Sequence, residues 1–280
     1  MVQRKILPRA LNVLVFFYFV FLLSPAIKGE LGGTFASRAL PKEYTDLKDF
    51  IHTKPEFFRT LWVPKQQKFN FYSYAHPAIS ADTLLGATSS AQLLSLLADQ
   101  SSREVLGALG VRYVIIPNDP YGDIFVEDHK YSDHERERFL KVVDGIPWLA
   151  RNGTFPTIAV YETHTWNDRF SLVDPTGTNS SRYTMIKPSH YQLSVTVASP
   201  TILVFAENYS PYWQAKIGNN LISSQKYQYG LNSFALSKIG TYNVDVTFSQ
   251  EMVYTYARYI SLAVIVSVVG MIVWKKPYEP

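Results

Sequence analysis

Hydrophobic residues gather in two dense runs near the ends of the chain, and the chain between them mixes polar and apolar stretches. Residues 10–27 and 259–274 contain no charged side chain. Uncharged apolar runs approaching about 20 residues are typical of helices that cross a bilayer. The sequence therefore predicts transmembrane helices at 10–27 and 257–274, and the first run also suits a signal anchor or a cleaved signal peptide.

The basic residues at the two ends of the chain give these predicted helices an orientation. They are Arg4, Lys5, Arg9, Lys275 and Lys276. Because basic flanks stay on the cytoplasmic side of a membrane, segments 1–9 and 275–280 are predicted to be cytoplasmic and residues 28–258 extracytoplasmic. The expected location is the cell membrane, spanned by two helices, with the main domain outside.

The region 28–173 mixes helical and extended patterns and predicts an extracytoplasmic α/β domain. Pro41 opens a helix whose apolar positions recur every three or four residues. Further helices are expected at 90–98, 102–109 and 133–143, the last with Asp133 as its N-cap, and strands at 58–63, 111–116 and 157–162. The uninterrupted apolar strand 111–116 follows a helix, a pattern typical of a buried parallel strand.

Short strands at close spacing replace this pattern after residue 190. Residues 174–190 are rich in Asp, Pro, Gly, Asn and Ser and are interpreted as a linker. Residues 191–256 predict a small antiparallel β-sandwich, with a hairpin turn at Gly218-Asn219-Asn220. The expected fold class is an α+β membrane protein in which two transmembrane helices flank an α/β subdomain followed by this sandwich.

Composition and charge narrow the classes of protein and of partner. The chain has 280 residues, 47% hydrophobic and 15% aromatic, which excludes general disorder. It has no Cys, so it has no disulfide, no thiolate metal site and no Cys nucleophile. The net charge of +4 arises at the chain ends, and acidic and basic residues balance within 28–258. The sequence therefore offers no electrostatic surface for nucleic acid.

The motifs of common catalytic and cofactor sites are missing. No G-x-S-x-G, P-loop or G-x-G-x-x-G pattern occurs. His134-Glu135 begins like a zinc-protease motif, but Arg138 stands where the second His belongs. Glu135 and Glu137 are two residues apart on a predicted helix and point to different faces. No catalytic residue, no metal and no cofactor is predicted.

The densest aromatic cluster lies between two predicted strands of the sandwich. Tyr209, Tyr212 and Trp213 occur within five positions. Aromatic faces stack on sugar rings, so these three residues are candidate glycan contacts. In the alternative interpretation, which we favour, Trp213 fills the core of the sandwich and Tyr209 shapes the turn.

Several segments together resemble a known family. Residues 207–220 read ENYSPYWQAKIGNN, and residues 234–248 read FALSKIGTYNVDVTF before the last apolar run. Upstream, residues 109–115 read LGVRYVI, preceded by an entry at 40–47 and by FRTL at 58–61. In this order the segments resemble the C-terminal end of YfhO-type bacterial membrane proteins, over roughly residues 36–275.

YfhO-type proteins resemble GT-C glycosyltransferases, which use polyprenyl-phosphate sugars to decorate envelope polymers. The resemblance implies an extracytoplasmic part in envelope glycosylation. Only one helix precedes the outer domain here, where the family has a helix bundle, so no residue inherits the catalytic role. Glu30 stands at the position of a juxtamembrane acid and is interpreted as an ordinary surface residue.

The predicted function is therefore a protein that is not catalytic alone and positions an acceptor glycan or a partner subunit. The expected partners are the bilayer, a multi-helix glycosyltransferase and an envelope glycan. Two alternatives stay open: a surface carbohydrate-binding or adhesion module anchored at its C-terminus, and a complete membrane glycosyltransferase whose site is not recognised. The first of these is favoured if the chain is cleaved after Ala26.

Overall fold

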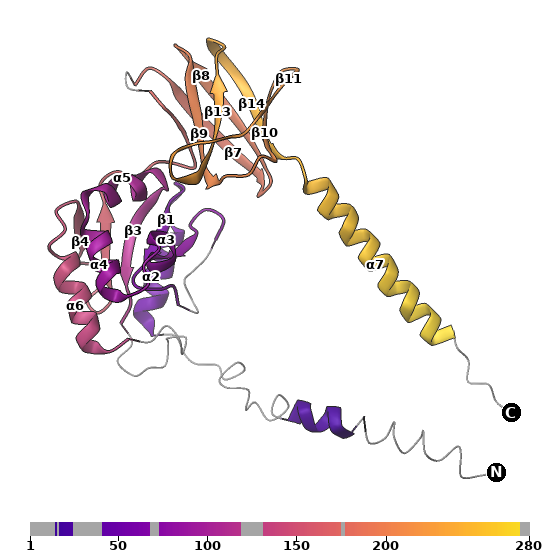
Figure 1. Ribbon diagram of the computed structural model, residues 1–280, viewed down its shortest axis with the longest axis horizontal. Coiled ribbons are helices and arrows are strands. Elements are labelled where there is room, and N and C mark those ends of the chain that lie inside the picture. The colour runs from indigo at the N-terminus through magenta and orange to yellow at the C-terminus, as the bar shows by residue number, and fades with distance from the viewer. Residues whose placement is uncertain are drawn as a thin grey trace.

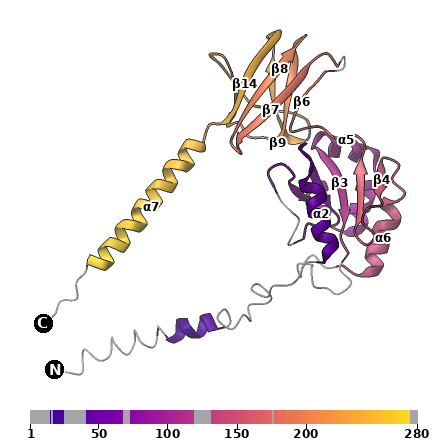
Figure 2. The same ribbon diagram turned by 180° about the vertical axis from the view of Figure 1, so that it is seen from behind.

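The chain forms two domains, and a long helix follows the second. The computed structural model describes residues 15, 17–24, 41–67, 73–118, 131–174 and 177–274. Figure 1 shows the β-rich domain stacked on one end of the α/β domain, with helix α7 (Glu251–Trp274) projecting away from both. Figure 2 shows the same arrangement from behind. The candidate acid Glu30 lies outside the described residues.

The N-terminal domain is built on a five-stranded mixed sheet. Its strands are β1 (Arg59–Trp62), β2 (Ala78–Ser80), β3 (Val111–Ile116), β4 (Leu149–Asn152) and β5 (Ala159–Thr163). The order across the sheet is β2-β1-β3-β5-β4, in which β1 runs parallel to β2 and β3 whereas β4 and β5 pair antiparallel. The prediction of a buried parallel strand at 111–116 is confirmed, and β4 lies in a region expected to hold only a polar insert and a helix.

Helices cover both faces of this sheet because its strands are apolar on both sides. The helices are α2 (Lys42–His52), α3 (Ala81–Leu85), α4 (Ser90–Ala98), α5 (Gln100–Ala108) and α6 (Asp133–Val143). Val114 and Ile116 pack with Leu93 and Phe139 in one core cluster, while Tyr113 and Ile115 pack with α2 in another. Alternate residues of β3 therefore enter different cores, which explains its uninterrupted apolar sequence.

The C-terminal domain is an antiparallel sandwich of two sheets. Its strands are β6 (Phe170–Leu172), β7 (Ser180–Lys187), β8 (His190–Val197), β9 (Thr201–Asn208), β10 (Trp213–Ile217), β11 (Asn220–Ser223), β12 (Gln225–Lys226), β13 (Leu231–Leu236) and β14 (Gly240–Phe248). One sheet has the order β11-β10-β14-β8-β7 and the other β12-β13-β9-β6. Side chains from both sheets, such as Val195, Phe205 and Val246, form a single core.

The sandwich begins earlier than the sequence indicated. Residues 174–190, interpreted as a linker, include β7, which pairs with β8 along its length. Most side chains of β7 are exposed because it is an edge strand, so its composition is that of a loop. The predicted hairpin is confirmed: Ile217 pairs with Asn220, and Gly218 has φ 59°, a backbone conformation that glycine adopts without strain.

One predicted helix start is also shifted. Asp133 was expected to cap the third of the predicted helices, but the cap is Ser132, whose hydroxyl accepts a hydrogen bond from the backbone N–H of Glu135. Asp133 is then the first helical residue, where its carboxylate is stabilised by the partial positive charge of the helix N-terminus.

The predicted membrane-spanning helices are wrong. Within the described residues no helix is long and apolar enough to cross a membrane. Helix α7 begins at Glu251 and carries Arg258 in its first third, so its charge-free part covers only 259–274. The part of the first run that is described and helical, 17–24, is shorter still. The fold is α+β with mostly antiparallel sheets, and the prediction of two flanking transmembrane helices is not supported.

Two buried arginines and one glutamate join the domains. Arg59 comes from β1, and its guanidinium donates to the carbonyl of Ala206 in the sandwich. Arg169 precedes β6 and donates to the carbonyl of Tyr74 in the α/β domain, with its guanidinium 4.1 Å from the ring centroid of Phe57. The carboxylate of Glu207 bonds Arg169 and lies 3.5 Å from Arg59.

Removing the charge of Glu207 is expected to loosen the domain junction. Glu207→Gln leaves two guanidinium groups, 10% and 4% exposed in their side chains, without their shared carboxylate. We expect a loss of about 2–3 kcal/mol in the free energy of unfolding, below the roughly 3–5 kcal/mol of a fully buried pair because Glu207 is 32% exposed. Denaturant unfolding, with exposed Glu104→Gln as control, measures this, and equal stability of the two variants would contradict it.

Trp213 is expected to stabilise the sandwich core. Its side chain is 8% exposed, and its ring centroid lies 4.8 Å from that of Phe205 and 5.2 Å from that of Phe248. Trp213→Ala should cost about 3–5 kcal/mol because it empties a large core volume. Its neighbour Tyr212, 44% exposed, is the control, and thermal melting of both alanine variants is the measurement. A Trp213→Ala variant that melts like the parent but loses glycan binding would overturn this assignment.

Candidate functional site

The loops at one edge of the α/β sheet enclose a cavity of about 330 Å³. Strand β1 runs into Pro64, and β2 runs into Asp82 of α3, at the same edge because the two strands are parallel. The cavity is lined by Pro64, Lys65, Asp82, Ala87, Thr88, Ser89, Ser90, Leu93, Tyr131 and Glu135. Ligands of open α/β sheets bind at the carboxyl ends of parallel strands, so this is the first place to look for a site.

The hydroxyl-rich wall of the cavity is held in place by the start of α4. Ser89 caps this helix by accepting a hydrogen bond from the backbone N–H of Gln92 at 3.3 Å. The Gln92 side-chain oxygen in turn accepts from the backbone N–H and the hydroxyl of Thr88, both at 2.9 Å. This reciprocal capping fixes the turn 88–90 and directs its small polar side chains to the cavity.

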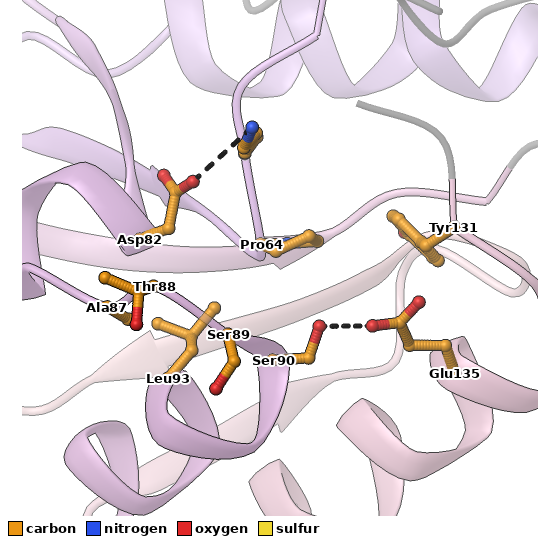
Figure 3. A pocket seen from close by; sticks show the side chains of 10 residues that line it. Pro64, Asp82, Ala87, Thr88, Ser89, Ser90, Leu93, Tyr131 and Glu135 are labelled. Carbon is orange, nitrogen blue, oxygen red and sulfur yellow. Dashed lines mark hydrogen bonds and ion pairs between the residues drawn. The ribbon is translucent and has the colours of Figure 1, made fainter. Parts of the chain in front are cut away.

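The opposite wall comes from the first turn of α6. The hydroxyl of Ser90 donates a hydrogen bond to the Glu135 carboxylate, which joins the starts of α4 and α6. Figure 3 shows these two side chains pointing toward one another from separate helices. A carboxylate in the first turn of a helix is stabilised there as an anion, so Glu135 serves as a hydrogen-bond acceptor.

The floor near β1 and β2 carries a second carboxylate. Asp82 Oδ1 accepts from the backbone N–H of Thr83 at 2.6 Å, and Asp82 Oδ2 lies 3.8 Å from Lys65 Nζ. The backbone N–H of Asp82 donates to the carbonyl of Pro64 at 3.1 Å, which ties the two loops together. With Asp82 and Glu135 facing Lys65, the lining has one more negative than positive charge.

The lining offers hydrogen bonds rather than covalent chemistry. It contains hydroxyls and carboxylates but no His, and Ser90 is bonded to a carboxylate, a weak base for activating a serine. Among the residues that the structure describes, no group of three or more His, Asp or Glu side chains could hold a metal ion. The arrangement is therefore suited to holding a ligand rich in hydroxyl donors.

The aromatic residues proposed from the sequence as glycan contacts do not form a shared surface. Trp213 points into the sandwich core, whereas Tyr209 and Tyr212 are 37% and 44% exposed. The ring of Tyr212 lies against Phe248, with centroids 6.1 Å apart. The backbone N–H of Tyr209 donates to the carbonyl of Gly230 and fixes the turn after β9. The structure brings none of the three to the cavity at the edge of the α/β sheet.

Sequence reasoning missed the pair Ser90 and Glu135. A signal was present, because Ser89-x-x-Gln92 and Ser132-x-x-Glu135 have the spacing of capping boxes and begin two helices of the same domain. Helices that cover the same face of a sheet and start at the same edge bring their first turns together. Glu135 was weighed only against Glu137 on its own helix, a comparison that cannot find a partner 45 residues away.

Comparison with protein-family models, with curated proteins and with solved structures finds no match to this chain. Arguments about function therefore rest on the chemistry of the described residues.

Proposed function

We propose that the chain is a non-catalytic, glycan-binding component of an extracytoplasmic envelope glycosylation system, and that it holds an acceptor saccharide in the cavity of the α/β domain. The motif resemblance to YfhO-type proteins supplies the system, and the cavity supplies the ligand class. The observation that carries the proposal is the pair Ser90–Glu135, which joins two helix starts across an acceptor-rich cavity.

A saccharide matches this lining because its hydroxyl groups are hydrogen-bond donors as well as acceptors. The carboxylates of Glu135 and Asp82 offer acceptor oxygens that Ser90 and Thr83 use only in part. Thr88 and Ser89 add hydroxyls, while Leu93 and Pro64 offer apolar surface to the C–H face of a sugar. A cavity of about 330 Å³ lies at the small end of ligand sites, a size for one or two sugar units.

A phosphorylated ligand matches poorly. Lys65 is the cationic side chain of the lining and is already close to Asp82, so the surplus charge is negative. A phosphate would meet two carboxylates at short range, which is unfavourable. This favours an uncharged acceptor over a sugar donor linked to a lipid phosphate, and it supports a positioning role in which a multi-helix partner supplies the catalytic site.

Neutral saccharides are expected to bind through Glu135. Calorimetric titration of the full chain with chitobiose, maltose and lactose should find at least one ligand, whose affinity falls about tenfold in Glu135→Gln because a charge-assisted hydrogen bond is lost. Glu137→Gln, exposed on the same helix, is the matched control and should bind like the parent. Glucose 1-phosphate should bind more weakly than the neutral sugars. Tighter binding of the phosphate, or no saccharide binding at all, would contradict the proposal.

The chain alone is expected to transfer no sugar from a polyprenyl-phosphate donor. Such transfer requires a base near the acceptor hydroxyl and a cationic surface for the donor phosphate, and the cavity lacks the second. Incorporation of a labelled sugar into an acceptor, measured with and without a multi-helix glycosyltransferase, is the assay. Turnover by the chain alone that Glu135→Gln abolishes would assign the chemistry to this cavity and refute the non-catalytic role.

A further inference from the structure

A second cavity, of about 420 Å³, opens at the end of the sandwich that faces away from the α/β domain. Strand β13 pairs antiparallel with β9, so Leu231 lies beside Asn208 at the domain junction and Leu236 lies at the opposite end. The cavity lies between the β10–β11 hairpin and the β13–β14 turn, near the labels β11 and β14 in Figure 1. It is lined by Ile217, Gly218, Asn220, Ile222, Ala235, Ser237, Lys238, Tyr242 and Asn243.

The hydroxyl of Tyr242 is buried beside this cavity without a hydrogen-bond partner. Among the described residues, the side-chain atoms in this condition are Tyr242 OH and Trp148 Nε1. Burial also raises the pKa of Tyr242, so its hydroxyl keeps its proton and is available as a donor. A buried donor without an acceptor destabilises a protein, and native structures seldom keep one without a reason. Because Tyr242 lines a cavity, an acceptor can reach it from that side.

A positive charge stands next to this hydroxyl. Lys238 Nζ lies 5.6 Å from the centroid of the Tyr242 ring. None of the ion pairs formed by the described residues involves Lys238. The hydroxyl donor and the ammonium group thus belong to the same corner of the cavity. An anion with two oxygens can accept the O–H and face the ammonium at once.

The remaining wall is apolar. Ile217 and Ile222 come from the two strands of the β10–β11 hairpin, and Ala235 comes from the opposite sheet. Both isoleucines pack on the sandwich core with part of their surface uncovered. A short hydrocarbon chain placed against them would remove apolar surface from water, which favours binding.

We propose that this end of the sandwich binds a small amphipathic carboxylate, with the carboxylate between Tyr242 and Lys238 and the hydrocarbon part against Ile217 and Ile222. The site is separate from the saccharide cavity and does not depend on it. The ligand class follows from three features of one cavity: a buried donor without a partner, an ammonium group without a carboxylate, and an apolar wall.

Calorimetric titration of the full chain with hexanoate, hexanol and hexylammonium tests the ligand class. These probes share one hydrocarbon chain and differ in the charge of the head. Hexanoate should bind about tenfold more tightly than hexanol, because its charge-assisted hydrogen bond is stronger than a neutral one, and hexylammonium should bind least. Lys238→Met should abolish the preference for hexanoate over hexanol, whereas Lys216→Met, exposed on β10 and outside the lining, should leave it unchanged.

Tyr242→Phe tests the orphan hydroxyl. The variant should lower hexanoate affinity about tenfold and leave the melting temperature of the unliganded chain unchanged or higher, since no protein hydrogen bond is lost. Equal binding of the three probes, no binding of hexanoate, or hexanoate binding that survives both Lys238→Met and Tyr242→Phe would overturn the proposal. A clear fall in the melting temperature of unliganded Tyr242→Phe would also overturn it, because the hydroxyl would then have a partner within the protein.

Discussion

Two guanidinium groups cannot be buried side by side without an anion, and this constraint fixes how the domains meet. Arg59 and Arg169 approach from opposite domains, and each donates to a carbonyl of the other domain. Glu207 is the carboxylate near both. Because the arginines obtain these partners only when the domains are docked, separation would expose unpaired groups of both. Buried charge therefore specifies the geometry of the junction as well as stabilising it.

The same constraint explains the unusual segment that follows Glu207. Asn232 is fully buried, and its amide donates to the carbonyls of Glu207 and Asn208 while its oxygen accepts from the N–H of Ser210. A few residues later Trp213 closes the core. A run of polar and aromatic residues that suggests a binding surface is thus accounted for by a junction, a buried amide and a core side chain.

The sequence predicted best the elements whose signal is local. The apolar strand 111–116, the turn at Gly218 and the helices of the first domain follow from periodicity and turn chemistry. Strand β7 was missed because an edge strand needs no apolar face, and β4 because its four residues show no alternation. The two end runs misled because hydrophobic composition was counted over segments longer than the charge-free helix that forms there.

The candidate sites were beyond local reasoning for a different reason. Ser90 and Glu135 meet because α4 and α6 cover one face of a sheet and start at one edge, and Tyr242 and Lys238 meet because a turn folds beside a hairpin. Both pairs depend on sheet order, which residue spacing does not encode. Their electrostatics differ: the first cavity has surplus carboxylate and favours hydroxyl donors, whereas the second has a free ammonium group and favours an anion. The two domains therefore differ in ligand chemistry as well as in architecture, so a ligand of one cavity should not compete for the other.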